Sequence, residues 1–497
     1  MSRRYRFGPI ERRPVVGPLR AGQFAFLAAG ALLALVSLYA LRSVVGVFLA
    51  LALLGGATVL IALPIEGRTA EEWAPVAARW ALRRRSAAAG YRTRAPQAGT
   101  RLDRQGDAHH ELSLPVELAG LELLGVPYGT AEVGVLRDAR AGTYTVALAV
   151  KGGPFILRDA AEQEQALAAW GDVLASTARD GSPVRRVQWL EQTVPEPGDD
   201  LAAHFQASRD RAVPLDSDLV RSYVELVESA APTATEHEIL IAIQVSERRG
   251  SRELRRLGGG VEGACQLALR EAEGLAERLA LADVVVSGLL RPRQYAAHLR
   301  DAYDPFGRHG RERLGLAEPE REGVEPALMG PAATEESWSY YRTDSAWHTS
   351  WWISSWPRSD VGPMFLVPLL MQAGVLRTVS VTIEPVPYSL AMRRAESAQT
   401  AEIADEIQRS RQGFVTTART RRRAQAVSRR EEELADGHAE LHFSGWLRVS
   451  HRTQADLERA EGELEHAAAL ARLGLQRAYG EQAAAFANTL LIAGGLK

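Results

Sequence analysis

Two uncharged runs near the N-terminus constrain this chain more than any other feature. Residues 21–41 contain no charged side chain, and residues 44–64 form a second such run after Arg42 and Ser43. A helix of about 20 residues spans the roughly 30 Å hydrocarbon core of a bilayer. Because only two residues separate the runs, we expect a transmembrane helical hairpin whose two outer ends emerge on the same side.

The arginines that flank the hairpin predict its orientation. Residues 1–20, a basic tail, hold six arginines, and residues 79–85 hold four, whereas the turn carries only Arg42. The positive-inside rule then places both termini and the bulk of the chain in the cytoplasm, below the inner (plasma) membrane. The residues expected to anchor the hairpin in lipid are Phe24, Phe26, Leu41, Val44, Phe48 and Leu63.

Two other interpretations of these runs stay open. A secretory signal peptide has one shorter apolar core and a small-residue cleavage site, whereas here a second full-length run follows without an A-x-A-like site. A buried helical hairpin in a soluble core also fits, because alanine and glycine are frequent in both runs. Release of the protein by a carbonate wash would favour the soluble form.

Residues 65–111 connect the hairpin to the rest of the chain. Within them, Trp73, Trp80, Arg83 and Arg84 lie on a segment with helical spacing directly after the second run. Tryptophan and arginine next to a span are typical of an interfacial helix that lies on the lipid headgroups. The alternative is a plain first helix of the soluble domain. The polar, aperiodic stretch 86–107 is predicted to be a linker.

The remaining chain predicts an α+β fold in which helices pack on a sheet. Residues 112–290 form a first subdomain, in which β-rich runs alternate with amphipathic helices. The expected strands are 131–136, 143–150, 184–190, 238–245 and 282–286, and the expected helices are 160–179, 219–228 and 254–280. The unbroken apolar run 238–245 indicates a central strand.

A second subdomain is predicted over residues 337–497, after a Gly-, Pro- and charge-rich loop at 291–336. Its expected strands are 347–357, 377–384 and 440–450, and its expected helices are 361–371, 454–474 and 481–490. Between them, residues 388–435 predict two long charged helices that run antiparallel and break near Gly413.

The sequence indicates no catalytic, cofactor-binding or metal-binding residues. Neither of the two lysines, Lys151 and Lys497, lies in a phosphate-binding loop, so the chain is not a P-loop ATPase. His438 and His442 are four residues apart at a strand start, where this spacing does not bring them onto one metal ion. Cys265 is the only cysteine, which excludes an intramolecular disulfide and suits a reducing cytoplasm.

A basic cluster in the second long helix is the candidate partner surface. It comprises Arg419, Arg421, Arg422 and Arg423. The formal net charge of −2 gives the whole chain no field that attracts nucleic acid, so direct contact with nucleic acid is not expected. A solvated helix is the plain alternative, because three glutamates follow at 431–433 and pair with arginines one turn away.

The C-terminal third resembles the non-motor N-terminal domain of conjugative type IV secretion ATPases of the TraC/TrsE type. The resemblance rests on the aromatic strand 348–357, the helix 365–370, the strand 378–384 with its Pro-Val-Pro ending, the helical pair around Gly413, the strand 437–450, and Leu490. In that family a motor domain follows the equivalent of residues 488–490, and no motor sequence is present here.

The N-terminal hairpin is similar to the small two-span inner-membrane subunit of the same machines. The whole layout resembles actinobacterial membrane proteins found with conjugation-like secretion genes. The resemblance implies a non-enzymatic scaffold in a multi-copy assembly, whose partners are membrane lipid, a separately encoded ATPase and other secretion subunits. Two alternatives are a membrane component of type VII secretion and a membrane-anchored enzyme of unknown chemistry.

Overall fold

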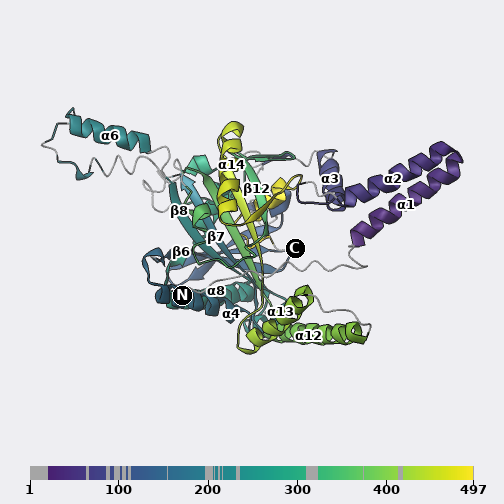
Figure 1. Cartoon of the computed structure of the whole chain (residues 1–497). Coiled ribbons are helices and arrows are strands. Elements are labelled where there is room, and N and C mark those ends of the chain that lie inside the picture. The colour runs from purple at the N-terminus through teal and green to yellow at the C-terminus, as the bar shows by residue number, and fades with distance from the viewer. Residues whose placement is uncertain are drawn as a thin grey trace.

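A single antiparallel sheet of 13 strands forms the centre of the described structure (Figure 1). The computed structural model describes residues 21–495 apart from 63–65, 86–89, 94–100, 103–107, 110–113, 154, 196–204, 206, 211–212, 215, 231–234, 309–322, 373 and 412–417. Across the sheet the order is β1-β10-β11-β12-β14-β13-β7-β8-β6-β5-β4, with β15 beside β12 and β9 beside β6.

The strands of this sheet are longest near its centre, where the two longest have 12 residues each. They are β1 (Gly90–Arg92), β4 (Leu121–Tyr128), β5 (Ala131–Asp138), β6 (Thr143–Gly152), β7 (Val184–Pro195), β8 (Thr235–Ser246), β9 (Val284–Leu289), β10 (Ala333–Glu336), β11 (Tyr341–Arg342), β12 (Trp347–Ser355), β13 (Leu376–Pro385), β14 (Leu441–His451) and β15 (Gly474–Arg477). A separate ribbon pairs β2 (Arg101–Leu102) with β3 (Ala108–His109).

Helices pack on both faces of the sheet or project from it. They are α1 (Ala21–Leu41), α2 (Val44–Ala62), α3 (Ala70–Arg85), α4 (Ala160–Thr177), α6 (Asp218–Ala230), α7 (Ser251–Arg256), α8 (Gly260–Leu281), α9 (Pro292–Tyr303), α11 (Val367–Leu370), α12 (Tyr388–Arg411), α13 (Ala418–Ala435), α14 (Gln454–Leu470) and α15 (Gln482–Ala487). Short 3₁₀ turns η1 (Val116–Leu118), η2 (Phe155–Leu157), η4 (Pro305–Gly307) and η6 (Pro326–Leu328) complete the connections.

Side-chain caps fix where two of the sheet-packing helices begin. Asp159 precedes α4 and accepts a hydrogen bond from the Glu162 amide at 2.8 Å, and the Glu162 side chain bonds back to complete a capping box. Thr453 precedes α14 and accepts from the Asp456 amide at 3.2 Å. These caps satisfy backbone N–H groups that the first helical turn leaves without partners.

The same topology occurs twice along the chain. The first copy runs β4-β5-β6-α4-β7-β8-α8-β9-α9, and the second runs β10-β11-β12-α11-β13-β14-α14-β15-α15. The strand pairings also match, because β6 lies between β8 and both β5 and β9, just as β12 lies between β14 and both β11 and β15. Each copy is thus a split β-α-β-β-α-β unit preceded by a two-stranded extension.

The two units join edge to edge through β7 and β13. These strands pair antiparallel from Val187 opposite Ile383 to Gln192 opposite Thr378. Two units joined in this way are related by an approximate two-fold axis through the sheet, so their corresponding helices lie on one face. Trp189 in β7 packs against the cores of both units on this face.

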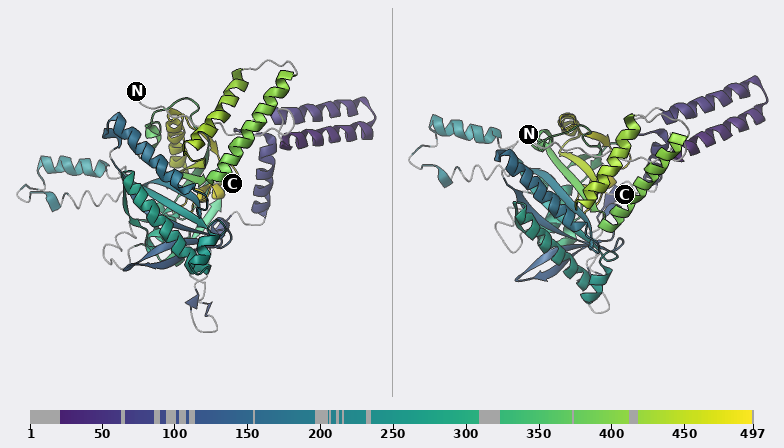
Figure 2. Two further views of the ribbon diagram at one scale, coloured as in Figure 1. Left: turned by 90° about the horizontal axis from the view of Figure 1, so that it is seen from below. Right: turned by 60° about the horizontal axis from the view of Figure 1, so that its bottom comes forward.

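Each unit carries helical insertions at the same place in its topology. In the first unit α6 lies between β7 and β8, and in the second α12 and α13 lie between β13 and β14. Because β7 and β13 run antiparallel, the two insertions leave the sheet at opposite ends (Figure 1). We call α12 and α13, which lie side by side in Figure 2, the helical arm.

The face of the sheet opposite to α8 and α14 has a polar centre. The C-terminal segment, residues 488–495, crosses this polar centre. Gln188 in β7 donates to the Leu490 carbonyl and accepts from the Ala493 amide, both at 2.8 Å. Ser380 in β13 donates to the Asn488 carbonyl at 3.0 Å. The segment therefore lies across the joint and satisfies buried polar groups on both central strands.

Most elements predicted from the sequence are confirmed, and four predictions are wrong. Of the helix expected over 361–371 only α11 is helical, and the linker expected at 86–107 contains β1, which pairs with β10 in the main sheet. The helix expected over 254–280 is broken into α7 and α8, because Gly258 and Gly259 adopt positive φ angles between them. The region 291–336, expected to be a loop, contains α9 and β10. Pro292 at the first turn of α9 is a helix-start signal that the Gly- and Pro-rich composition obscured.

The mixed α+β class is confirmed, and the division into subdomains stays a prediction. The ranges 112–290 and 337–497 each hold most of one unit, yet one sheet runs through both. The helical arm is confirmed as two helices, whereas Gly413, the basic tail 1–20 and Leu63 lie outside the described residues.

Candidate membrane anchor and partner surfaces

The N-terminal helical pair, α1 and α2, projects from the body of the molecule (Figure 1). Gln23–Leu41 in α1 has a mean hydropathy of 2.3, and it is long and apolar enough to cross a membrane. The described apolar stretch of α2, Val44–Val59, is shorter than a full span. Among the described residues one helix therefore meets the requirement by length and composition.

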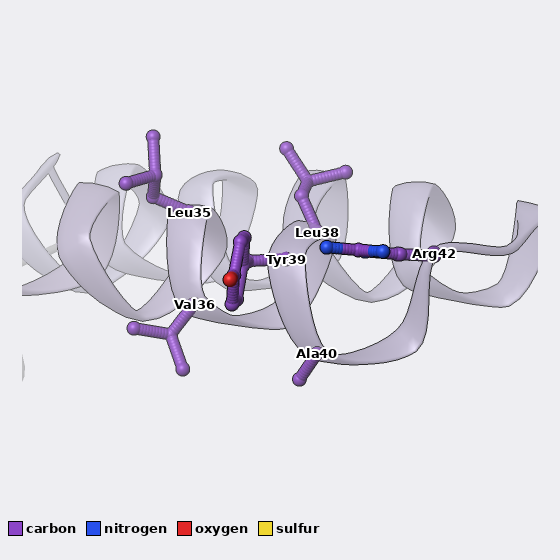
Figure 3. Close-up of a pocket in the computed structure, with 6 residues that line it drawn as sticks. All are labelled: Leu35, Val36, Leu38, Tyr39, Ala40 and Arg42. Atoms are coloured by element: carbon purple, nitrogen blue, oxygen red, sulfur yellow. The ribbon is translucent and has the colours of Figure 1, made fainter.

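Large apolar side chains cover the outer surface of this pair. Of the predicted anchor residues, Phe24, Leu41, Val44 and Phe48 are exposed and Phe26 is half-buried, with Val44 71% and Phe48 68% exposed. Near the turn, Leu35, Val36 and Leu38 project outward, and the Arg42 guanidinium lies 5.2 Å from the centre of the Tyr39 ring (Figure 3). Such a surface is expected of a helix that faces lipid rather than water.

Small residues hold the two helices together. Ala34, Ala50 and Ala57 are buried between them, and a Cβ atom on Gly30 would lie 2.8 Å from the Ala57 Cβ. The Ser37 hydroxyl donates to the Gly46 carbonyl at 3.2 Å. In lipid the hydrophobic effect does not drive helices together, and small residues that let two backbones approach closely are typical of helix pairs there.

Replacing Gly30 by valine is expected to separate α1 from α2, because the added side chain has no space against Ala57. The cost is about 1–3 kcal/mol, as for other overpacked contacts. Gly55→Val is the matched control, since a Cβ atom at Gly55 meets nothing within 4 Å. Disulfide trapping between cysteines placed across the pair measures the effect, and equal trapping in both variants would contradict it.

The helix α3 binds the edge of the C-terminal unit through aromatic rings. The Trp338 ring lies 5.7 Å from that of Trp73 in a stacked arrangement and 5.1 Å from that of Trp80, edge to face. Val76 between them is buried, and Gly480 leaves the space for this approach, because its Cβ would lie 3.1 Å from Val76. We call this contact the α3 clamp.

Ion pairs flank the α3 clamp at both ends. Arg83 lies 3.2 Å from the Glu336 carboxylate and 3.8 Å from that of Glu117. Arg68 and Arg79 lie 3.1 and 3.2 Å from Glu481. Of the predicted interfacial residues, Trp73, Trp80 and Arg83 contact the C-terminal unit, and the Arg84 guanidinium lies 5.2 Å from the centre of the Trp80 ring. The position of this helix on the lipid headgroups stays a prediction.

The two carboxyls near Arg83 are held in a desolvated site. Burial raises the pKa of Glu336, against the opposing effects of the Ala483 amide, which donates to it at 3.0 Å, and of Arg83. Burial likewise raises the pKa of Glu117, while its backbone hydrogen bond and Arg83 oppose the shift. Arg83 is therefore the cation that favours the charged form of both buried carboxyls, against the effect of burial.

Replacing Arg83 by glutamine is expected to destabilise the protein by about 2 kcal/mol at pH 8, because it leaves two carboxylates without their cation. When folding raises the pKa of a carboxyl, the protein loses stability as the pH rises through that folded-state pKa. Removal of Arg83 raises the folded-state pKa of Glu336 further. The loss is thus smaller at pH 5. Chemical denaturation at both pH values measures it; equal losses, or an equal loss in Arg84→Gln, would contradict the electrostatic origin.

The helical arm is fixed to the body at its root. Val386, Ala391, Ala395 and Leu434 form a small buried cluster there. The Tyr388 amide donates to the Ala178 carbonyl at 3.0 Å, which ties the arm to the end of α4. The predicted partner surface of Arg419, Arg421, Arg422 and Arg423 lies in α13 at the far end, and the side chains of these residues are outside the described part of the structure.

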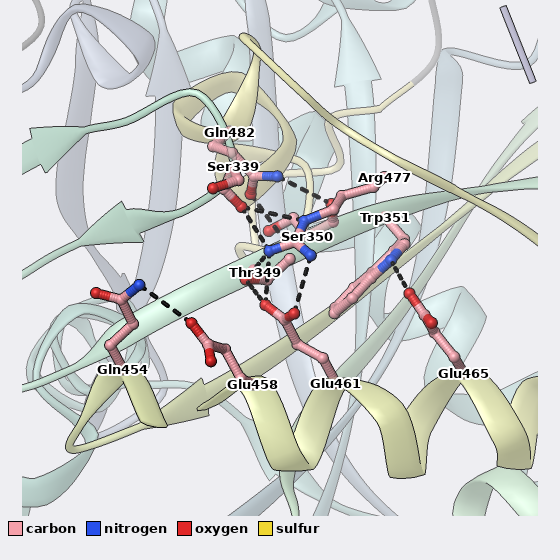
Figure 4. A network of polar contacts seen from close by, with 10 residues as sticks. All are labelled: Ser339, Thr349, Ser350, Trp351, Gln454, Glu458, Glu461, Glu465, Arg477 and Gln482. Atoms are coloured by element: carbon pink, nitrogen blue, oxygen red, sulfur yellow. Dashed lines mark hydrogen bonds and ion pairs between the residues drawn. The ribbon is translucent and has the colours of Figure 1, made fainter. Parts of the chain in front are cut away.

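A polar network under β12 joins Arg477 and Glu461 with neighbouring hydroxyl and carbonyl groups (Figure 4). The Arg477 guanidinium lies 2.7 Å from Glu461 on α14 and donates to the Ser339 carbonyl at 2.9 Å. Thr349 donates to the same carboxylate. Since these groups satisfy one another, the network ties β12, β15 and α14 together and leaves no carboxylate oxygen of Glu461 without a partner.

The remaining candidate residues are each engaged locally. His442 lies 3.1 Å from the Glu440 carboxylate, and His438 contacts the Glu433 carbonyl at 3.1 Å. Among the described residues no group of three or more His, Cys, Asp or Glu is placed to hold a metal ion. Burial raises the pKa of the Cys265 thiol to about 11, which is typical of an unreactive cysteine.

Sequence reasoning missed the residues that receive α3. Trp338, Tyr479 and Glu481 lie in the C-terminal unit, far along the chain from their partners on α3. The Arg83–Glu336 contact beside Trp338 joins residues 253 positions apart, and the Arg79–Glu481 contact joins residues 402 positions apart. Only the tryptophan-rich composition of residues 337–356 hinted at an aromatic contact surface. Pairing across such a separation leaves no local pattern.

The fold and these surfaces define a mixed α/β protein made of two like units in one sheet, with α3 clamped to its edge and the apolar pair of α1 and α2 projecting from the body. No protein-family model matches the chain, and no curated protein matches it.

Proposed function

We propose that this protein is a membrane-anchored scaffold subunit of a conjugation-like type IV secretion complex, which docks a separately encoded motor ATPase. The observation that carries the proposal is the α3 clamp, because it joins the exposed apolar surface of α1 and α2 to the sheet through stacked tryptophans and ion pairs.

The proposal includes two membrane spans with both termini in the cytoplasm. The apolar outer surface of the helical pair supports lipid contact, and the arginine-rich flanks support the orientation. Carbonate washing of membranes is expected to leave the chain in the pellet. A cysteine placed at Ser43 is expected to react with a membrane-impermeant reagent from outside, whereas one at Ser359 is not; release by carbonate or the opposite labelling would overturn the anchor.

The secretion context rests on the resemblance of the C-terminal third, and a partner experiment tests it. After cross-linking in native membranes, the full chain is expected to copurify with a P-loop ATPase of the type IV class. Recovery of small WxG-type secretion substrates instead would favour the type VII alternative. Recovery of no ATPase from intact membranes would overturn the scaffold proposal while leaving the membrane anchor to be judged by the labelling experiment.

A further inference from the structure

A small cavity lies beside the C-terminal segment, on the face of the sheet that this segment crosses. Its volume is about 140 Å³. Its wall is formed by η1, the β5–β6 hairpin, the first residues of β7, part of β8 and residues 492–494 of the C-terminal segment. A cavity of about 150 Å³ accepts benzene, so this one has space for a molecule of about six non-hydrogen atoms.

Two deeply buried side chains in the wall of the cavity have a polar atom without a partner. Thr143 is 1% exposed and Gln244 is 6% exposed. The Gln244 amide nitrogen donates to the Thr145 hydroxyl at 3.3 Å and to the Ile492 carbonyl at 3.4 Å. Neither the Gln244 side-chain oxygen nor the Thr143 hydroxyl forms a hydrogen bond with any residue that the structure describes. Because buried polar groups are nearly always satisfied, these two atoms point to a polar occupant of the cavity.

Positive charge reaches the cavity from the start of β7. Arg185 lines the cavity, and its guanidinium forms no hydrogen bond or ion pair with the described residues. The neighbouring Arg186 guanidinium lies 3.4 Å from the Glu384 carboxylate and donates to the Ala493 carbonyl at 3.2 Å. Burial and the charge of Arg185 lower the pKa of Arg186. An anionic group at Arg185 would offset this repulsion and form a charge-assisted hydrogen bond.

Negative charge reaches the cavity from η1 and from the end of β5. Glu117 and Asp138 line it. Asp138 accepts from the Arg140 and Ala141 amides at 2.9 and 3.0 Å, which fix its carboxylate at the hairpin turn. Burial raises the pKa of Glu117 although Arg83, 3.8 Å away, opposes the shift, and a further cation would favour the charged form. The wall therefore offers partners for both signs of charge.

The backbone of the wall is strained at one residue. Ala493 has a φ of 51°, in the left-handed region that residues other than glycine rarely adopt. Its amide donates to the Gln188 side chain at 2.8 Å and its carbonyl accepts from Arg186, so contacts on both sides hold it in place. Strained backbone that is fixed by its surroundings is common at ligand sites.

We propose that this cavity binds a small zwitterion, an α-amino acid of about the size of alanine, with its carboxylate on Arg185 and its ammonium group on Glu117. The Gln244 side-chain oxygen and the Thr143 hydroxyl accept the remaining hydrogen bonds of the ammonium group. The ligand then joins η1, the β5–β6 hairpin and the C-terminal segment. The inference goes beyond the proposed scaffold role and does not depend on it.

Calorimetric titration of the full chain in detergent micelles with L-alanine tests the site. L-alanine has as many non-hydrogen atoms as benzene. Lactate, which has a hydroxyl in place of the ammonium group, and alaninol, which lacks the carboxylate, are the matched ligands. We expect L-alanine to bind and each matched ligand to bind about tenfold more weakly, because each loses one charge-assisted hydrogen bond.

Two variants test the assignment of the charged groups. Arg185→Gln is expected to weaken the binding of L-alanine about tenfold and to leave that of alaninol unchanged, because only the carboxylate loses its partner. Thr143→Val, which keeps nearly the same shape in β6, is expected to weaken the binding of L-alanine severalfold. Arg252→Gln is the control, since Arg252 is exposed on α7 and does not line the cavity.

The other outcomes contradict the proposal. Absence of binding heat with L-alanine at millimolar concentration would overturn it and leave the cavity to water. Lactate that binds as tightly as L-alanine would exclude a zwitterion site, and equal affinities in Arg185→Gln and Arg252→Gln would exclude Arg185 as the partner of the carboxylate. None of these results bears on the membrane anchor or on the motor, which the labelling and copurification experiments test.

Discussion

Replacing Trp338 by alanine is expected to release α3 from the sheet while the sheet stays folded. The indole contacts the rings of Trp73, Trp80 and Tyr479, so its loss removes the centre of the α3 clamp. Truncation of a large packed aromatic costs about 3 kcal/mol. Opening of α3 then becomes about one hundredfold more frequent, which hydrogen exchange of its backbone amides measures directly.

The control for this variant is Trp356→Ala. Trp356 lies in the same tryptophan-rich region, but its ring packs 5.2 Å from that of Phe443 in β14 and against the core of the second unit. We expect α3 amides to keep their protection in this control while β14 loses some. If α3 exchanges equally fast in both variants, the clamp is not what holds it. If the Trp338 variant also fails to copurify a motor ATPase, rigid anchoring is part of the function.

Replacing Gln188 by leucine is expected to lower the free energy of unfolding by about 4 kcal/mol. The side chain is fully buried, donates to Ser380 and to the Leu490 carbonyl at 2.8 Å, and accepts from the Ala493 amide. Leucine fills the same space but leaves the backbone groups of the C-terminal segment without partners, and each such group costs about 1–3 kcal/mol.

Gln454→Leu is the matched control for this change. Its amide lies on the exposed surface of α14 and bonds only to Glu458 among the described contacts, at 3.2 Å. A surface exchange of this kind changes stability by less than about 0.5 kcal/mol. Denaturant titration compares the two variants, and a Gln188→Leu protein as stable as the control would show that the C-terminal segment does not depend on this hydrogen bonding.

Local patterns predicted most of the elements. The alternation in residues 377–384 identified β13, and the unbroken apolar run 238–245 identified β8. Both signals are local, because the order of apolar and polar residues within one strand reflects which of its side chains are buried. The strands β10, β11 and β15 were missed, since each is 2–4 residues long and has no periodicity to read. The repeated topology was also missed, because equivalent strands of the two units have the same pattern of pairing but not similar sequences.

The candidate surfaces were predictable to a smaller extent. Trp73, Trp80 and Arg83 were singled out because tryptophan and arginine follow an apolar run, and the structure brings these three together on one side of α3. Their partners Trp338 and Glu336 were not identified, because a contact between distant segments depends on sheet order. Arg84 lies over the Trp80 ring, whereas the side chains of Arg419, Arg421, Arg422 and Arg423 are outside the described part of the structure.

The joint between β7 and β13 has the geometry of a symmetric dimer interface. A single β-α-β-β-α-β unit would expose the equivalent of β7 as an unprotected edge, and an edge strand that pairs antiparallel with its own copy gives a closed, self-complementary dimer. The present chain has the form of such a dimer fused into one polypeptide. Because one polypeptide holds both units, their insertions need not be alike, so α6 at one end and the helical arm at the other offer two different surfaces where a symmetric dimer would offer the same one twice.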